Sequence, residues 1–269
     1  MGLTSMLNEG GWRLIALALA LCLIVAPIAA CAGGGEESGE PAAGAAADAG
    51  EPAGRGEEAE GEHEHGAPAD IPSRAEEMAR DEYSKPQEVF DFLGIGAGAT
   101  VVDINAFTGY NTYLFAERVG DSGRVYAERG NEALRARMEH GDLAGAGNIV
   151  IPESWATIPD GSVDAIIAIR EYHLVRDYEA LLANMMRVLK PGGVVGVVEV
   201  RLNEAHGHDM DTHRMGEQTI IEQFQEGGFE YAGDSDILRR DDDDYTTLGG
   251  PQGVRYITDR MLLKFARPQ

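Results

Sequence analysis

Five short apolar runs, most of them rich in valine or isoleucine and separated by segments with helical spacing, limit most strongly how this chain can fold. The runs are residues 100–104, 124–128, 148–151, 163–168 and 193–200. Nearly continuous apolar strands are typical of a parallel sheet that is covered by helices on both faces, because neither face meets water. Strands that alternate with helices supply the βαβ units of such a sheet. The sequence therefore predicts an α/β domain.

Further elements extend this core in both directions. The clearest helix precedes the fifth strand, where Leu182, Met185 and Leu189 recur at helical spacing. A helix and two more strands, the last expected to be antiparallel, follow the fifth strand and bring the sheet to seven. The predicted ranges are 74–83, 86–93, 177–189 and 216–227 for helices, and 229–238 and 255–265 for the last two strands.

The first thirty residues have the pattern of an export signal. An apolar run from Leu14 to Ala30 follows Arg13, and its end, Ile28-Ala29-Ala30-Cys31, resembles the bacterial lipobox, which is cleaved before a lipid-carrying cysteine. We therefore expect residues 1–30 to be a lipoprotein signal peptide and Cys31 to carry the lipid. Ala32 in place of an aspartate favours an outer membrane, with the protein facing the periplasm. The alternative is an ordinary N-terminal membrane anchor that contains a cysteine.

Composition separates a tether from the domain that follows it. Residues 31–70 are rich in glycine, alanine, proline and acidic residues and lack large apolar side chains, so we expect them to be disordered. Residues 71–269 then form the domain. The formal net charge of −24 argues against a nucleic acid partner, because it repels phosphate. Cys22 and Cys31 both precede the domain, so we expect no disulfide and no cysteine nucleophile in it.

The loop after the first predicted strand carries the main functional signal. It runs from Asp103 to Asn111 and contains Asn105, Phe107 and Gly109. This segment resembles the first motif of class I S-adenosylmethionine-dependent methyltransferases, in which an acidic residue is followed by three alternating glycines. Asp103 corresponds to the acidic residue, and Asn105, Phe107 and Gly109 stand at the three glycine positions. Asn105 can adopt left-handed backbone geometry at low cost, whereas Phe107 can do so only with strain.

Later segments agree with this resemblance. Glu128 ends the second predicted strand nineteen residues after Gly109, where an acidic residue usually binds ribose hydroxyls. Lys190-Pro191-Gly192-Gly193 resembles the turn that precedes the fifth strand of class I methyltransferases. The resemblance implies S-adenosylmethionine as the methyl donor. The residues expected to bind it are Asp103, Asn105, Gly109, Tyr110, Asn111, Glu128, Glu153 and Ser154.

Residues 74–268 are also similar to a family of predicted methyltransferases found in bacterial exported proteins. The shared features are Arg80-Asp81, Lys85-Pro86, Arg170-Glu171-Tyr172-His173, His213-Arg214, Gly228-Phe229 and Thr258-Asp259-Arg260. This resemblance implies a Rossmann-like, seven-stranded class I methyltransferase sheet flanked by helices. For the loop at 103–109 the alternative is a tight turn that binds nothing. NAD is disfavoured because the G-x-G-x-x-G spacing is absent.

Candidate catalytic residues follow the fourth predicted strand. Arg170, Tyr172 and His173 leave the carboxyl end of that strand, where ligands of such sheets bind. His173 is the preferred general base, since an unperturbed imidazole titrates near neutral pH. Arg170 is expected to hold an acidic substrate or a carboxylate of the cofactor. The alternative is that the cluster ties its loop to neighbouring acids such as Asp259.

Two polar segments later in the chain raise the question of a metal site. Residues 204–213 contain three histidines and two aspartates, but the acid falls at the wrong offset for the H-x-H-x-D-H pattern of hydrolases. A polar, mobile substrate loop is predicted instead. Residues 241–244 are four consecutive aspartates, predicted to form a solvated loop, with a weak calcium site as the alternative. We therefore assign no metal ligand.

The predicted function is methylation of a small molecule by an exported, lipid-anchored enzyme that uses S-adenosylmethionine. The expected partners are the small-molecule acceptor and a lipid membrane, reached through Cys31. The alternative is a non-catalytic, ligand-binding pseudoenzyme with a methyltransferase fold, which Phe107 would favour. A tethered envelope protein whose acidic surface contacts partners is a third hypothesis.

Overall fold

The computed structural model describes residues 74–248 and 257–269. The predicted signal peptide, the lipidated Cys31 and the tether lie outside these residues. Within the described ranges no helix is both long and apolar enough to cross a lipid bilayer.

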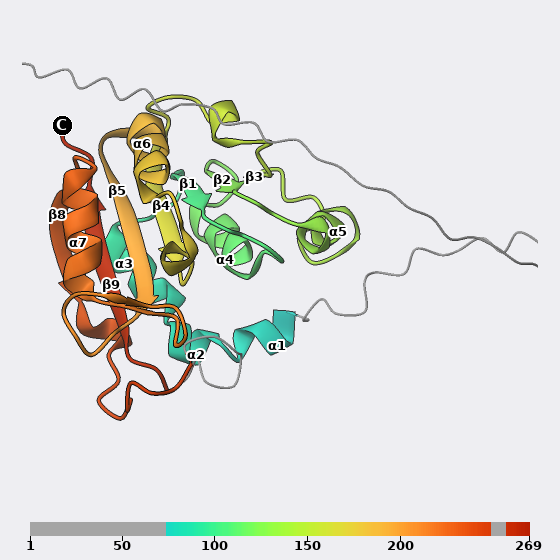
Figure 1. Ribbon diagram of the computed structural model, residues 1–269. Helices are drawn as coiled ribbons and strands as arrows, with labels where there is room; N and C mark the ends of the chain where they lie inside the picture. The colour runs from blue at the N-terminus through green and yellow to red at the C-terminus, as the bar shows by residue number, and fades with distance from the viewer. Residues whose placement is uncertain (1–73, 249–256) are drawn as a thin grey trace, which may run out of the picture. The chain divides into compact units, whose positions relative to one another are not determined.

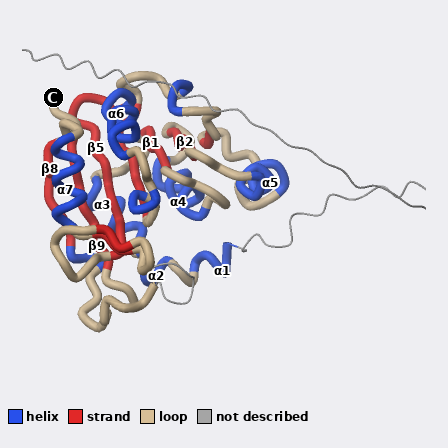
Figure 2. The backbone as a smooth tube through the Cα atoms, viewed as in Figure 1, coloured by secondary structure: helices blue, strands red, loops and turns tan. Residues whose placement is uncertain are grey.

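A seven-stranded sheet forms the centre of the structure (Figures 1 and 2). Its strand order is β3-β2-β1-β4-β5-β9-β8, in which the first five strands are parallel and β9 is antiparallel to both β5 and β8. The predicted Rossmann-like sheet with an antiparallel last strand is confirmed. The strands are β1 (Thr100–Asp103), β2 (Arg124–Ala127), β3 (Ile149–Val150), β4 (Val163–Ile169), β5 (Leu189–Val200), β8 (Glu230–Ser235) and β9 (Arg260–Ala266).

Helices cover both faces of the sheet because side chains alternate along each strand. In β1, Val101 packs into one apolar cluster and Val102 into the other. The cluster around Val101 includes side chains of α3 (Pro86–Leu93), α4 (Tyr110–Val119) and α5 (Glu132–His140). The cluster around Val102 includes side chains of α6 (Tyr178–Val188) and α7 (Glu217–Glu226). In Figure 1, α7 lies over β8 and β9.

The predicted helix at 74–83 is interrupted and forms α1 (Arg74–Met78) and α2 (Asp81–Ser84). At the break the N–H of Arg80 donates to the carbonyl of Glu77 over 2.9 Å, which is a tighter turn than an α-helix makes. Contacts with other parts of the fold hold both residues. Glu77 forms a buried, bidentate pair with Arg137 at 3.0 Å, and the Arg80 guanidinium stacks 3.8 Å from the Tyr110 ring.

Two later segments also differ from their predictions. The last strand begins at Arg260, and residues 257–259 of the predicted strand precede it, where the carboxylate of Asp259 accepts hydrogen bonds from Arg239 Nε and the Arg240 N–H; residues 255–256 lie outside the described residues. The segment at 204–213, predicted to be a mobile loop, contains strand β6 (His208–Asp209), which pairs with β7 (Arg214–Met215).

The sequence predicts a solvated loop at 241–244, but in the structure part of this loop is buried. The Asp243 side chain is 1% exposed and forms a bidentate pair with Arg214, whose side chain is 0% exposed, at 2.8 and 3.0 Å. Burial favours a higher pKa for Asp243, but Arg214 and the N–H groups of Asp259 and Tyr245 bring that pKa below its usual value. The loop is therefore anchored to β7 through a buried ion pair.

Candidate active site

The strand that leads into the site ends on a buried carboxyl group. Asp103 is the last residue of β1 and is 1% exposed, and its Oδ2 accepts a hydrogen bond from Thr112 Oγ1 of α4 at 2.7 Å. Burial raises the pKa of Asp103 to about 7, which the nearby Glu171 and Glu128 support and the Thr112 hydrogen bond opposes. The predicted cofactor residue Asp103 therefore joins β1 to α4 behind the loop.

The loop between β1 and α4 follows the left-handed path that glycines would allow. The φ angle is 50° at Asn105, 44° at Phe107 and 88° at Gly109. For Phe107 this conformation costs about 1–2 kcal/mol, which agrees with the predicted strain. Two contacts hold it, a bridge to Gly130 and a hydrogen bond from the Asn131 N–H to the Phe107 carbonyl at 3.0 Å.

Gly109 is required by its surroundings as well as by its φ angle. A Cβ atom at this position would lie 2.5 Å from Cδ1 of Leu134 in α5, far inside normal contact. The glycine therefore lets α4 begin directly beside α5.

Glu128 and Asn105 are brought together at the carboxyl ends of β1 and β2. The N–H of Asn105 donates to Glu128 Oε2 at 3.2 Å. Burial raises the pKa of Glu128, although the Asn105 N–H and the charge of Arg129 act in the opposite direction. Both residues line an open cleft, which we call the Glu128 cleft. Phe107, Trp155 and Leu181 line it too, so a carboxylate faces largely apolar walls.

Other predicted cofactor residues lie elsewhere. Tyr110 and Asn111 line a second pocket on the other side of the loop. Glu153 and Ser154 are exposed and stand just ahead of Trp155. Trp155 was not predicted, although a single tryptophan directly after the third strand could have indicated it.

His173 lies inside a chain of hydrogen bonds. Its side chain is 3% exposed, its Nδ1 is 2.9 Å from Glu199 Oε2, and its Nε2 is 2.9 Å from Nδ1 of His213. Glu199 is fully buried and also accepts the N–H groups of Tyr172 and His173 through Oε1. In the tautomer in which His173 Nδ1–H donates to Glu199, His173 Nε2 accepts from Nδ1–H of His213. Nε2 of His213 is then the outer nitrogen of this Glu199–His173–His213 chain.

Glu199 is a functional residue that the sequence reasoning missed. The available signal was a single acid inside the valine-rich run at 193–200. The acid that holds the His173 cluster is therefore Glu199. Asp259, the partner considered from the sequence, pairs instead with Arg201 at 3.4 Å and Arg239 at 3.0 Å.

The other two predicted catalytic residues point to different surroundings. Tyr172 is buried, and its hydroxyl donates to Gln223 of α7 at 3.0 Å. Burial is also the main reason that the pKa of Tyr172 is raised. Arg170 has a φ angle of 60° and lines the same second pocket as Tyr110. The three predicted catalytic residues thus have different surroundings: His173 contacts Glu199 and His213, Tyr172 contacts Gln223, and Arg170 lines the second pocket.

Glu171 is hydrogen-bonded to a residue of the Glu128 cleft and stands two residues before His173 in the chain. Its Oε2 accepts a hydrogen bond from Asn105 Nδ2 at 2.9 Å. Burial raises the pKa of Glu171 to about 7; the Asn105 hydrogen bond and the charge of His173 lower it, and Glu199 raises it. Among the described residues, no group of three or more His, Cys, Asp or Glu side chains is arranged to hold a metal ion.

Known proteins resemble this arrangement in sequence and in fold. Residues 102–197 match a family described as a methyltransferase domain. The ubiquinone/menaquinone biosynthesis C-methyltransferase of Enterobacter sp. is 34% identical over 114 residues, which are 40% of this chain and 45% of that protein. The crystal structure of a SAM-dependent methyltransferase from Aquifex aeolicus has a TM-score of 0.55 at 18% identity, covering 70% of this chain and 93% of that one.

The chain therefore has the fold of class I methyltransferases, and its central part is similar to a methyltransferase domain in sequence. It spans less than half the length of the curated relative from Enterobacter. A [4+2]-cyclase also has the methyltransferase fold, with a TM-score of 0.52 at 18% identity over 69% of this chain and 80% of that one. The fold by itself therefore does not fix the reaction.

The residues of the Glu128 cleft fit S-adenosylmethionine, the methyl donor of this class. The Glu128 side chain is 13% exposed at the edge of the cleft, where its carboxylate can accept two ribose hydroxyls. Trp155 and Leu181 offer flat and apolar surface for an adenine ring. Phe107 replaces a glycine of the first motif but keeps the left-handed backbone path of that glycine.

Proposed function

We propose that this protein is an S-adenosylmethionine-dependent methyltransferase that acts on a small molecule. The observation that carries the proposal is that one segment serves both places: Glu171 is hydrogen-bonded to Asn105 of the Glu128 cleft, and His173 of the Glu199–His173–His213 chain follows two residues later. A cleft suited to the donor and a set of imidazoles suited to proton transfer lie at the carboxyl ends of neighbouring parallel strands. Ligands of open α/β sheets bind at this edge.

The bound donor would supply an electrophilic methyl group on its sulfonium. Glu128 would hold the ribose hydroxyls, and the backbone of Asn105 holds Glu128 in place. His213, the outer imidazole, accepts a proton from the acceptor at Nε2 and passes its Nδ1 proton to His173 Nε2. The positive charge then rests on His173, directly beside the buried carboxylate of Glu199. In this proposal His173 is a positioning and relay residue, and His213 is the group that touches the substrate.

We also propose that the protein is anchored in the bacterial envelope through a lipid on Cys31. The support is the sequence Ile28-Ala29-Ala30-Cys31 at the end of an apolar run. The acidic, glycine-rich segment at 31–70 would then serve as a tether between the membrane and the domain.

Calorimetric titration of the full chain with S-adenosylmethionine tests the proposed activity at its first step. Glu128→Ala removes charge-assisted hydrogen bonds worth roughly 1.5–3 kcal/mol, so affinity is expected to fall about ten- to hundredfold. Glu139→Ala is the matched control, because Glu139 is an exposed acid on α5 outside the cleft. It should leave the affinity unchanged.

Phe107→Gly separates the enzyme from the pseudoenzyme alternative. The substitution removes a bulky side chain from the cleft and relieves the left-handed strain, so it should tighten donor binding. Donor binding by this variant together with no binding by the wild type would identify a decayed site. Tight wild-type binding that is indifferent to Glu128→Ala would overturn the assignment of the cleft.

A further inference from the structure

The second pocket collects positive charge in a strongly acidic protein. Its lining includes Arg80, Arg170 and Arg260, and we call it the arginine pocket. Among the described residues that line it there is no aspartate or glutamate, although the chain has a formal net charge of −24. Acidic residues outnumber lysine and arginine in this chain, so three arginines around one pocket are not expected from the composition alone. The grouping therefore points to a ligand of opposite charge.

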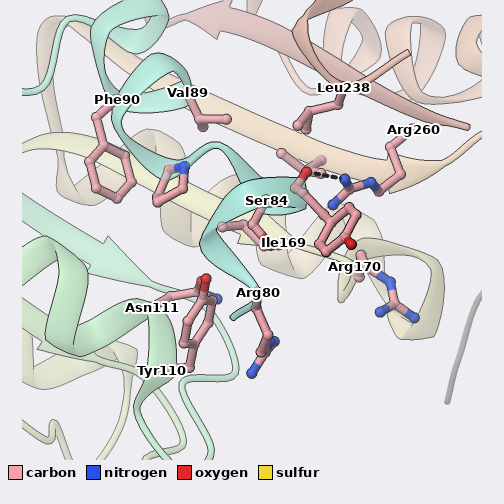
Figure 3. A pocket seen from close by; sticks show the side chains of 13 residues that line it. Arg80, Ser84, Val89, Phe90, Tyr110, Asn111, Ile169, Arg170, Leu238 and Arg260 are labelled. Atoms are coloured by element: carbon pink, nitrogen blue, oxygen red, sulfur yellow. Dashed lines mark hydrogen bonds between the residues drawn. The ribbon is translucent and has the colours of Figure 1, made fainter. Parts of the chain in front are cut away.

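The three arginines come from distant parts of the chain. Arg80 precedes α2, Arg170 follows β4 and Arg260 begins β9. In Figure 3, Arg260 lies at the upper right, Arg170 at the right and Arg80 below, beside Tyr110, while Phe90 lies at the left. Val89, Phe90 and other apolar side chains of the lining give the pocket an apolar end as well as a cationic one. An amphipathic molecule matches this shape.

Contacts with neighbours hold the arginines in place. The Arg80 guanidinium stacks over Tyr110 at 3.8 Å, and its Nε is buried with no hydrogen-bond partner among the described residues. Arg260 donates to the carbonyl oxygen of Tyr83. The pKa of Arg170 is lowered mainly by burial and further by the charges of Arg260 and Arg80, whereas Glu199 and Glu171 act against this. The cationic charges are thus close enough to repel one another, and a bound anion would relieve that repulsion.

The arginine pocket and the Glu128 cleft meet at two consecutive residues. Arg170 lines the pocket, and Glu171 is hydrogen-bonded to Asn105, which lines the cleft. We propose that the arginine pocket binds the oxyanion group, a carboxylate or phosphate, of an amphipathic methyl acceptor. This inference rests on the proposed function, because it names the substrate class of the same site.

The donor itself is a poor occupant of the pocket. The methionine end of S-adenosylmethionine carries an ammonium beside its carboxylate and a sulfonium close by, so the donor bears a net positive charge. Three arginines would repel it more than one carboxylate could offset. A molecule with a net negative charge and an apolar body satisfies both ends of the pocket.

The test compares 2-naphthoate with its uncharged isostere 2-naphthamide, titrated calorimetrically into the full chain without donor. Wild type should bind naphthoate at least tenfold more tightly than naphthamide. Arg260→Met and Arg80→Met keep an unbranched apolar stem and lose the charge, and each should reduce the preference below threefold. Arg260→Lys should retain part of it. Arg135→Met is the matched control, since Arg135 is an exposed arginine on α5 and should leave the preference intact.

Titration of the same variants with S-adenosylhomocysteine identifies the source of the anion. The proposal expects its affinity to stay within about twofold of wild type in both pocket variants. A tenfold loss, with no preference for naphthoate, would assign the arginines to the carboxylate of the cofactor and overturn the proposal. Equal binding of naphthoate and naphthamide by wild type would overturn it too. A naphthoate preference in a protein that binds no S-adenosylhomocysteine would keep the pocket and reject the methyltransferase function.

Thermal unfolding of each variant shows whether it is folded. Arg80 lies outside the sheet, so Arg80→Met tests the pocket even if Arg260→Met disturbs β9. Loss of the naphthoate preference in a folded Arg80→Met protein supports the proposal. A full preference in that protein contradicts it.

Discussion

Two carboxyl groups near the proposed donor site have pKa values close to neutrality. The pKa values of Asp103 and Glu171 are each raised to about 7, in both cases chiefly by burial. Each carboxyl accepts a hydrogen bond, Asp103 from Thr112 and Glu171 from Asn105. The protonation state of this edge of the sheet therefore changes within the range of pH in which cells live.

Replacing Asp103 by asparagine should change how the stability of the domain depends on pH. Between about pH 4 and 7 the folded protein holds a proton on Asp103 that the unfolded chain has lost, so wild-type stability falls as pH rises. The slope reaches up to ~1.4 kcal/mol per pH unit for one group. The amide side chain introduced by Asp103→Asn cannot titrate, so the stability of this variant relative to wild type should increase across the same window.

Urea denaturation at several pH values between 4.5 and 7.5 measures this difference. The exposed Asp121→Asn is the control and should show a constant offset from wild type. A constant offset for Asp103→Asn as well would show that its carboxyl titrates in the folded state as it does in the unfolded chain.

At the level of elements, the sequence predicted what depends on local pattern. The five parallel strands were found because valine and isoleucine runs mark strands that are buried on both faces. The helix at 177–189 was found because its spacing is helical. In the structure Asp177 caps it, with Oδ1 accepting the Ala180 N–H at 2.9 Å. The break at Arg80 and the late start of β9 depend on tertiary contacts and have no local signal.

The site was less predictable for the same reason. Glu128 follows from its distance to Gly109, but the Glu199–His173–His213 chain joins residues up to 40 positions apart. The arginine pocket joins Arg80 to Arg260 across most of the domain. Only the order of strands in the sheet brings these side chains together, and a sequence pattern does not contain their distances.

The anchoring of the acidic loop gives a prediction at this scale. Arg214→Met leaves the buried carboxylate of Asp243 without its bidentate partner, so the free energy of unfolding should fall by about 3–5 kcal/mol. Asp243→Asn should also destabilise, and the double variant should lose less than the sum of the two. Urea denaturation of the full chain measures all three values.

The neighbouring exposed pair provides the matched control. Arg240 and Asp242 pair at 2.9 Å, but the Asp242 side chain is 66% exposed. Arg240→Met should therefore cost less than about 1 kcal/mol. Equal losses for Arg214→Met and Arg240→Met would show that burial does not strengthen the Arg214–Asp243 pair.

For the whole molecule, the main prediction concerns its attachment. In a bacterial host the wild-type chain should sediment with the membranes and carry a lipid on Cys31, because the preceding Ile28-Ala29-Ala30 fits a lipoprotein cleavage site. Cys31→Ser removes the acceptor and should leave an unprocessed, unlipidated protein. Fractionation with mass spectrometry of the N-terminus measures both. Cys22→Ser is the control, and a Cys31→Ser protein processed like wild type would reject the anchor.

The position of β9 has a consequence for the order in which the domain can be assembled. β9 lies between β5 and β8 although it follows both in the chain, and within the described sheet β9 is the neighbour that pairs with β8. During synthesis β8 emerges before β9, the strand with which it pairs. The edge of β5 that pairs with β9 also has no partner until β9 is made. The sheet can close only after residues 260–266 have appeared. Late closure of this kind leaves the chain unfolded until its synthesis is nearly complete, which would suit the export proposed above.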